Sequence, residues 1–244
     1  MATTKLELTD VGMTFGTGDA EVTALSEISL AVEPGELVIL LGPSGSGKST
    51  LLSVAGALLS PTDGKVHLEG DDIAQKSAKE RTRIRLEQIG FIFQGANLIS
   101  YLTAREQLLF IAELTGMNRD DAAKRADRLL EQLGMAKRAN AYPGEMSGGE
   151  RQRIAVGRSL MNDPGLILAD EPTASLDSER GHQVVEMLAA EVHERERAAI
   201  LVTHDERLID ACDRVIRIQD GRITVDKPTD KVEPDDLADR TDSH

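Results

Sequence analysis

An eight-residue loop, GPSGSGKS at residues 42–49, lies between an apolar run and a helical pattern. The apolar run 37–41 is typical of a buried strand, and residues 49–55 continue as a helix. Glycines let the main chain wrap around an anion, so that successive N–H groups point at phosphate oxygens. Lys48 can reach the β- and γ-phosphates, and the Ser49 hydroxyl can ligate Mg²⁺. The sequence therefore predicts a site for a nucleoside triphosphate with Mg²⁺.

The alternative interpretation of this loop is a glycine-rich turn that binds no ligand. A strand before the loop and a helix after it form the context that a phosphate-binding loop requires, which disfavours the alternative. We expect the whole loop and the first residue beyond it to contact nucleotide. These residues are Gly42, Pro43, Ser44, Gly45, Ser46, Gly47, Lys48, Ser49 and Thr50.

The charge balance of the chain argues against nucleic acid as a partner. Its 244 residues carry 42 acidic and 28 basic side chains, a net charge of −14, whereas phosphate backbones attract basic surfaces. The basic cluster at 79–85 is interleaved with Glu80 and lacks stacking aromatics, so a solvated helix face is the favoured interpretation. The single cysteine, Cys212, excludes a disulfide within the chain and is expected to be a small core residue.

The sequence carries no sign of membrane insertion. Residues 1–7 contain no apolar signal region, and no stretch approaches the roughly 18 uncharged apolar residues that a membrane span needs. We therefore expect a soluble chain, which leaves open that it docks on a membrane protein.

Apolar spacing divides the chain into short strands and amphipathic helices. The apolar positions of 122–133 fall on one helix face, a second amphipathic helix is expected around Val184–Val192, and a polar helix over 77–88. The expected strands are Lys5–Leu8, Glu21–Ala31, 37–41, Lys65–Leu68, Ile89–Phe93, Leu166–Ala169, Ala198–Val202, and the hairpin of Arg214–Ile218 with Arg222–Val225.

This alternation of strands and helices around a phosphate loop predicts an α/β fold. We expect one nucleotide-binding domain over residues 1–225, with a helical subdomain inserted at about 95–160. Residues 226–244 are rich in Asp, Thr and Pro and poor in apolar groups, so we expect an acidic, disordered tail.

Two consecutive acids end the apolar strand Leu166–Ala169. Burying bare carboxylates is costly, so acids at the end of an apolar run usually face a cation or a ligand. We expect Asp170 to hold Mg²⁺, and Glu171 to orient and polarise the attacking water. The alternative is a strand that simply emerges into solvent.

The strand at 198–202 is also followed by polar residues, among them His204. A lone histidine is more often structural, but ligands of open α/β sheets bind along the edge where strands end, which favours a site role. The segment Ser147-Gly148-Gly149 opens another helix and forms a second candidate anion site, although it could be only a flexible N-cap. One nucleotide does not need two phosphate loops from one chain, which suggests that the second serves a partner's nucleotide.

Taken together, these motifs resemble the ATP-binding-cassette (ABC) ATPases, from residue 4 to about residue 225. The segment Met146–Glu150 resembles that family's signature motif, and Leu166–Glu171 its Walker B strand with the catalytic glutamate. The segment Ala174–Asp177 resembles the D-loop, Gln94 the Q-loop, and His204 the switch histidine. Five motifs in the family's order are far more specific than any one of them.

The resemblance implies an ABC-type fold with an antiparallel β subdomain and a head-to-tail homodimer that binds two ATP molecules at its interface. Each ATP would lie between the loop 42–49 of one subunit and Ser147 to Gly149 of the other. The resemblance also implies a role for Phe15, where the family stacks an aromatic ring on adenine. The implied catalytic residues are Glu171, His204 and Lys48; the implied Mg²⁺ ligands are Ser49, Gln94 and Asp170; and the further nucleotide contacts are Phe15, Gln94, Ser147, Gly148, Gly149 and Asp177.

Three residues depart from the family's usual pattern. Phe15 stands where the family often has Tyr, and it supplies the same π-face. Met146 replaces Leu and Glu150 replaces Gln, both outside the Ser-Gly-Gly that would contact phosphate. We expect the change at Phe15 to have little consequence.

A chain with one cassette and no span resembles the ATPase subunit of a transporter at the cytoplasmic face of the bacterial membrane. Residues 91–98 and the signature motif resemble the branch serving macrolide exporters, lipoprotein-release systems and the cell-division ATPase. Residues 98–108 most resemble the ATPase of bacterial haemin exporters. The resemblance implies export of an amphipathic substrate, haem, which the permease rather than this chain would bind. The alternatives are macrolide or lipopeptide export, lipoprotein release, and transmembrane signalling.

In the family, a helix of the permease docks near the segment that corresponds to Gln94–Leu102. Ile99, Tyr101 and Leu102 are apolar enough for such a groove, but they could equally pack internally. A rival function is an ABC ATPase that acts on ribosomes or DNA. Those relatives usually carry two cassettes or a long coiled coil, and this chain has neither and is acidic.

Overall fold

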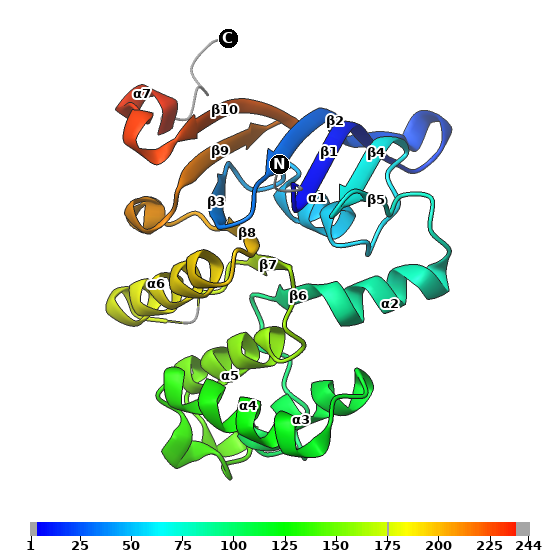
Figure 1. Cartoon of the computed structure of the whole chain (residues 1–244). Coiled ribbons are helices and arrows are strands. Elements are labelled where there is room, and N and C mark those ends of the chain that lie inside the picture. The colour runs from blue at the N-terminus through cyan, green and yellow to red at the C-terminus, as the bar shows by residue number, and fades with distance from the viewer. Residues whose placement is uncertain (1–3, 175, 238–244) are drawn as a thin grey trace.

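The computed structural model describes residues 4–174 and 176–237 and places them in two sheets and a group of helices (Figure 1). A four-stranded antiparallel sheet has the order β2-β1-β4-β5, and a six-stranded sheet has the order β10-β9-β3-β8-β7-β6. The strands are β1 (Leu6–Phe15), β2 (Val22–Val32), β3 (Glu36–Leu41), β4 (Asp63–Leu68), β5 (Asp71–Asp72), β6 (Ile89–Ile92), β7 (Leu166–Asp170), β8 (Ala198–Val202), β9 (Arg214–Gln219) and β10 (Arg222–Pro228). The helices are α1 (Lys48–Ala55), α2 (Ala78–Gln88), α3 (Ala104–Leu114), α4 (Arg119–Gln132), α5 (Gly148–Leu160), α6 (Ser178–Glu194) and the short α7 (Pro234–Leu237).

The six-stranded sheet is parallel except for its edge strand β10, which pairs antiparallel with β9. Strand β3 lies between β8 and β9, and β8 also pairs with β7, so that Asp170 is opposite Val202 in the register. The carboxyl ends of β3, β7 and β8 therefore meet at one edge of the sheet. That edge carries the phosphate loop, the two acids and the histidine.

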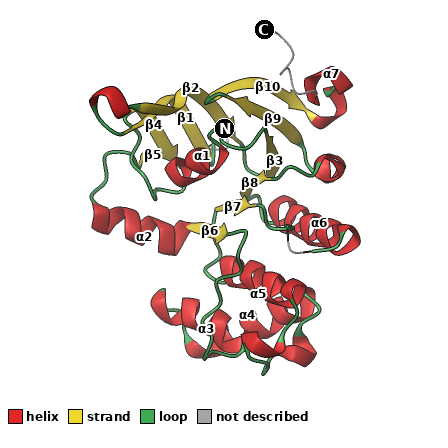
Figure 2. Cartoon of the chain, turned by 180° about the vertical axis from the view of Figure 1, so that it is seen from behind, coloured by secondary structure: helices red, strands yellow, loops and turns green. Residues whose placement is uncertain are grey.

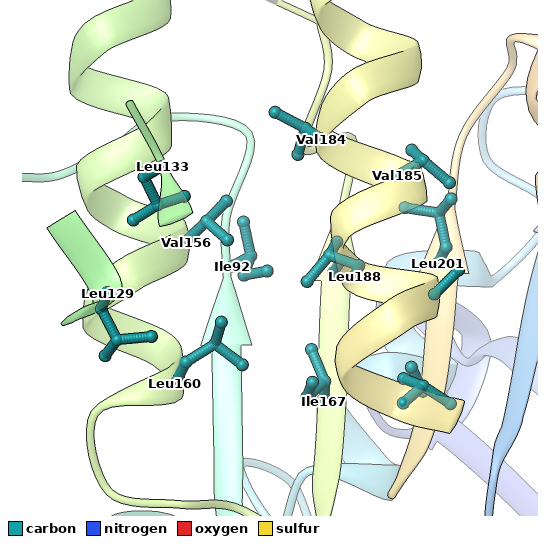
Figure 3. Packing of buried hydrophobic residues seen from close by; sticks show 14 of the residues in the cluster. Ile92, Leu129, Leu133, Val156, Leu160, Ile167, Val184, Val185, Leu188 and Leu201 are labelled. Atoms are coloured by element: carbon teal, nitrogen blue, oxygen red, sulfur yellow. The ribbon is translucent and has the colours of Figure 1, made fainter. Parts of the chain in front are cut away.

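Helices α3, α4 and α5 form a group at one end of the molecule, apart from the strands (Figure 2). Their buried faces join one hydrophobic cluster with the sheet and with α6. Leu129 and Leu133 lie near Val156 and Leu160 of α5, while Leu188 of α6 packs on the sheet (Figure 3). The predicted faces at 122–133 and 184–192 are confirmed, since their apolar members are all buried; these are Ala122, Ala126, Leu129, Leu130, Leu133, Val184, Val185, Leu188 and Val192.

A half-buried arginine helps to tie α4 to the rest of the chain. Arg125 donates from Nε to the Met161 carbonyl at 3.0 Å and from Nη2 to the Leu160 carbonyl at 2.8 Å. The same Nη2 lies 2.8 Å from Asp163 Oδ1, and Arg197 also contacts that carboxylate, at 2.6 Å. Hydrogen bonds to main-chain carbonyls at the end of α5 satisfy orphan acceptors that the helix cannot satisfy itself.

The expected disorder from residue 226 is wrong for the segment that the structure describes. Strand β10 continues to Pro228, a 3₁₀ turn covers Thr229–Lys231, and α7 follows. Val232 and Leu237 pack against the hydrophobic cluster, and Thr229 Oγ1 donates to the Cys212 carbonyl at 2.7 Å. The segment is ordered because these few apolar and main-chain contacts outweigh its polar composition. Residues 238–244 of the expected tail lie outside the described residues.

Two further expectations concern Cys212 and the basic cluster. Cys212 is buried, so the prediction of a small core residue is confirmed, and burial raises the pKa of its thiol to about 12. Residues 79–85 lie on α2, which has no buried residue. Within residues 4–174 and 176–237, none of the helices combines the length and apolar character that a membrane crossing requires.

Candidate functional site: a phosphate loop facing two acids and a histidine

A cavity of ≈ 460 Å³ lies at the edge where β3, β7 and β8 end. It brings together most of the predicted site residues, which come from four separate stretches of the chain. The lining residues are Ala24, Gly42, Ser44, Gly45, Gly47, Lys48, Ser49, Thr50, Gln94, Asp170, Glu171, Val202 and His204.

Two positions of the loop require glycine because the main chain of another segment passes close to them. Gly42 has a φ of 150°, and a Cβ there would lie 2.1 Å from the Ile218 carbonyl oxygen. Gly47 has a φ of 105°, and a Cβ there would lie 2.5 Å from the Ala24 carbonyl oxygen. A side chain at either position would have to displace main chain, so the loop shape needs glycine.

Lys48 is the first residue of α1 and projects back over the loop. Its Nζ donates to the carbonyl oxygens of Gly42, at 2.8 Å, and Pro43, at 2.7 Å. Burial lowers the pKa of Lys48, while the nearby carboxylates of Glu171 and Asp170 oppose this shift. A cation held beside an open glycine loop is suited to bind the phosphates of a nucleotide.

Glu171 and His204 lie in direct contact although they are far apart in sequence. His204 Nδ1 is 2.9 Å from Glu171 Oε1, and the Thr203 hydroxyl donates to Glu171 Oε2 at 3.4 Å. The Glu171 N–H donates to the Val202 carbonyl at 2.9 Å, and the residue has a φ of 49°. A left-handed backbone conformation costs a non-glycine residue about 1–3 kcal/mol, and residues with this conformation cluster at functional sites. The neighbouring strand β8 therefore fixes where this carboxylate points.

The oxygen ligands at this edge fit a magnesium ion whose coordination is completed by phosphate oxygens. Ser49, Gln94 and Asp170 line the same cavity and offer hydroxyl, amide and carboxylate oxygens. No cluster of three or more His, Cys, Asp or Glu side chains able to hold a metal occurs in the part of the chain that the structure describes. Mg²⁺ in nucleotide sites keeps several waters and is typically bound by one or two carboxylates and the substrate phosphates, which agrees with a set whose one carboxylate is Asp170.

Several predicted contacts do not line this cavity within one chain; these are Phe15, Pro43, Ser46, Ser147, Gly148, Gly149 and Asp177. Phe15 ends β1 and is 42% exposed, so its ring is free to meet a ligand. Ser46 turns inward, where its Oγ is buried. Asp177 caps α6 by accepting from the Arg180 N–H at 3.0 Å. Ser175 of the predicted D-loop lies outside the described residues.

The segment 147–149 forms the amino end of α5. Ser147 Oγ accepts from the Glu150 N–H at 3.2 Å, and Glu150 Oε2 accepts from the Ser147 N–H at 2.7 Å. This capping box uses the acid that stands where the family has glutamine, and Arg138 pairs with the same carboxylate at 3.2 Å. Met146 is buried in the core. Both departures from the signature pattern therefore have structural roles outside the Ser-Gly-Gly.

Sequence reasoning missed Thr203 and Ala24. Thr203 is fully buried and contacts the Glu171 carboxylate, a role that its place between the strand and His204 could have suggested. Ala24 reaches the cavity from β2 of the other sheet. No local pattern marks a residue of a second sheet as part of this site.

The family model described as "ABC transporter" matches residues 25–174, more than half of the chain. The chain belongs to the ABC transporter family. It is an ATP-binding subunit, an ATPase whose hydrolysis of ATP is coupled to transport, and its cofactors are ATP and Mg²⁺. The predicted α/β ABC fold with an antiparallel sheet and a helical subdomain is confirmed.

This ABC ATPase is similar to two curated staphylococcal proteins that bear the name "Putative hemin import ATP-binding protein HrtA". The one from Staphylococcus haemolyticus is 49% identical over 89% of this chain and 98% of its own length. The one from Staphylococcus aureus, strain bovine RF122, is 46% identical over 90% and 99%. These values confirm the predicted likeness to haemin-transporter ATPases.

Two solved structures of the bacterial ABC transporter cassette MJ0796 have the same fold. Its dimeric structure has a TM-score of 0.85 and 35% identity, covering 92% of this chain and 98% of that chain. Its dimeric post-hydrolysis state, bound to ADP and Pi, has a TM-score of 0.84 and 34% identity over the same shares.

Proposed function

We propose that two copies of this ABC ATPase form a head-to-tail dimer, with ATP bound between residues 42–49 of one copy and 147–149 of the other. The observation that carries this proposal is the position of Ser147. Within one chain it does not line the cavity that holds Lys48 and Glu171, yet it opens a 13-residue helix whose first N–H groups are suited to phosphate. The two MJ0796 structures are dimeric, and one of them is bound to ADP and Pi, which supports a nucleotide-binding dimer here.

The reaction is ATP + water → ADP + phosphate, and Glu171 acts on the water. Its carboxylate orients the water and takes up a proton, while His204 and Thr203 hold that carboxylate from the next strand. Lys48 neutralises charge on the phosphates, and Phe15 offers a face to adenine. Ser49, Gln94 and Asp170 would hold Mg²⁺, which when bound neutralises phosphate charge.

The permease docks on an apolar groove beside the site. A hollow of ≈ 280 Å³ is lined by Phe91, Phe93, Ile99 and Phe110, and Arg158 lines it as well. Phe93 is 40% and Phe110 39% exposed, so large apolar surfaces remain uncovered in the single chain. Such a groove suits the apolar face of a partner helix. Within the predicted docking segment, Ile99 lines this groove, and Tyr101 is 76% exposed.

The transported substrate is haem, and the direction is export. The proposal of haem as the substrate rests on relatives whose names specify hemin and which are 46–49% identical over about nine-tenths of this chain. Those names say import. We take export from the likeness of residues 91–108 to the exporter branch. The ATPase would then lie at the cytoplasmic face of the membrane, and the permease would bind the haem.

The experiment is haemin transport by the chain purified with its permease in lipid vesicles, with ATP supplied outside. Complexes whose ATPase faces outward use that ATP, so export fills the vesicle lumen with haemin. We expect saturable stimulation of ATPase activity by haemin and accumulation in the lumen, both absent with Glu171→Gln. ATP-driven loss of haemin from preloaded vesicles would establish import instead. An active complex indifferent to haemin would exclude haem as the substrate.

A further inference from the structure

A cavity of ≈ 440 Å³ lies between α3 and α4, in the helical group at one end of the molecule (Figure 1). Its volume is in the range of pockets that hold small molecules. The lining residues are Arg105, Leu109, Ala112, Glu113, Gly116, Met117, Arg119, Ala122 and Ala123. None of these residues lines the nucleotide cavity or the apolar groove. Neither the ATP site nor the proposed permease contact therefore accounts for this cavity.

Small residues on the facing sides of the two helices leave this space open. Ala112 of α3 and Ala122 of α4 line it and are almost fully buried, 1% and 4% exposed, and side chains this short leave space between the helices. A Cβ at Gly116, in the turn that joins the helices, would meet no other atom within 4 Å. The cavity is therefore open to solvent at this turn.

The wall of the cavity suits a flat apolar body. Leu109 and Met117 line it, and both are partly buried against the hydrophobic cluster. A thioether packs favourably against aromatic rings, and the flexible side chain of methionine adapts to their shape. Burial of an apolar ring against these side chains would supply the main driving force for binding.

The charged groups of the cavity favour an anionic group on the ligand. Arg105 and Arg119 line it with a single acid, Glu113, although the chain as a whole has a net charge of −14. Arg105 is held by Asp127, with its Nε 2.6 Å from Oδ1 and its Nη2 3.1 Å from Oδ2. Arg119 is exposed, and its side chain makes no hydrogen bond or ion pair within residues 4–174 and 176–237. Its guanidinium is therefore available to a carboxylate.

We propose that the cavity between α3 and α4 binds an amphipathic ligand with a flat apolar ring and carboxylates, and that this ligand is haem. The identity of the ligand rests on the proposed function, because haem is the proposed cargo. Its ring packs against Leu109 and Met117, and its propionate carboxylates meet Arg119 at the open side. The ATPase thus binds its cargo at a site of its own, apart from the permease, and can sense free haem.

The test is a haemin titration of the full chain without its permease. The chain carries Glu171→Gln and is saturated with ATP and Mg²⁺, so that the nucleotide cavity is occupied throughout. Visible absorbance of haemin measures binding, and we expect one saturable site per chain.

Two variants of the cavity and one matched control locate the site. Arg119→Glu should weaken haemin binding by at least about tenfold, since it replaces an attraction for carboxylate with a repulsion. Ala123→Phe fills the cavity and should weaken binding by a similar factor. Arg128→Glu reverses an exposed charge on the same helix outside the cavity, and should change the affinity by less than about twofold. Dialysis should show unchanged ATP binding in all three variants.

Phe93→Ser tests the other apolar surface where haemin could bind. Phe93 lines the groove proposed for the permease and is 40% exposed. Haemin affinity should be retained in this variant. Loss of affinity in Phe93→Ser, with normal affinity in Arg119→Glu and Ala123→Phe, would place haemin in the groove and overturn the inference.

The outcomes separate this site from the proposed cargo. A chain with no saturable haemin binding, in a complex that still transports haemin, would overturn the inference and leave haem as the cargo. Equal affinity in the parent chain and in both cavity variants would overturn it as well. Saturable binding that both variants weaken, with no transport of haemin by the complex, would support the cavity and overturn haem as the cargo.

Discussion

The imidazole of His204 and the carboxylate of Glu171 lie 2.9 Å apart, held by the ends of two neighbouring parallel strands. The register that sets Asp170 opposite Val202 places the next residues, Glu171 and Thr203, beside each other and His204 within reach. Glu171 has left-handed backbone, and its N–H is tied to Val202, so the carboxylate is positioned by the sheet before any ligand binds. The pairing of β7 with β8 thus determines the geometry of the hydrolytic centre.

We expect Glu171→Gln to lower the ATPase rate by about 10²- to 10⁴-fold, the usual contribution of a positioned general base. The amide keeps the size of the side chain but cannot accept a proton. ATP binding should persist, since the contacts of Lys48 and Ser49 are unchanged. Single-turnover hydrolysis and equilibrium binding of ATP measure the two effects. Hydrolysis near the normal rate would remove Glu171 from this role.

His204→Ala should lower kcat by about 10²-fold while changing the KM for ATP little. The imidazole holds a carboxylate that acts on water and is itself largely exposed. Steady-state kinetics at saturating Mg²⁺ provide the measurement. His182→Ala, a histidine on the surface of α6, is the matched control. A large rise in KM with unchanged kcat would place His204 in ground-state binding instead.

The affinity for ATP should begin to fall at a lower pH than it would if Lys48 had the pKa of an exposed lysine. Burial lowers the pKa of Lys48, so the free protein loses this positive charge at a lower pH than an exposed lysine does. Phosphate binding favours the charged form, and affinity therefore decreases as pH rises through the pKa of the free protein. ATP binding to the Glu171→Gln variant from about pH 7 to about pH 10 measures the fall.

Lys48→Ala is the control for this pH dependence. It should weaken ATP binding by at least about 10²-fold because a charged donor to phosphate is lost. Its remaining affinity should lack the alkaline fall. The same fall in both proteins would assign the pH dependence to another group.

Ser147→Ala should abolish most ATPase activity while destabilising the chain only slightly. Ser147 is the N-cap of α5, and Ser77 is the N-cap of α2 in the same kind of capping box. Loss of either cap should cost about 1 kcal/mol in the free energy of unfolding. Only Ser147 belongs to the proposed second phosphate site, so Ser77→Ala should retain activity. Equal activity in the two variants would show that Ser147 acts only as a helix cap. Thermal unfolding with ATPase assays tests the pair.

Local patterns predicted the individual elements well where sequence neighbours decide the structure. The helix predicted over 77–88 spans Ala78–Gln88, and the strand predicted at 37–41 spans Glu36–Leu41. Ser77, with Glu80 three residues later, sets the helix start through a capping box, which is visible in sequence. The loop 42–49 is equally local, since its glycines set its shape.

Contacts between distant segments could not be predicted from local patterns. The sequence placed Glu171 and His204 each at the end of a strand, but only the pairing of β7 with β8 shows that they touch. The segment after residue 225 was misjudged because its order depends on Val232 and Leu237 meeting a cluster built elsewhere in the chain. Ala24 was missed for the same reason, since it comes from the other sheet.

The mass of the Glu171→Gln chain in solution tests most directly whether the ATP site is shared between two copies. Light scattering with ATP and Mg²⁺ should give about twice the 26.4 kDa of one chain, and about one chain's mass without nucleotide. Adding Ser147→Arg should keep the chain monomeric with ATP bound, whereas Ser77→Arg should leave the dimer intact. A Glu171→Gln chain that saturates with ATP and stays at the mass of one chain would contradict the shared site.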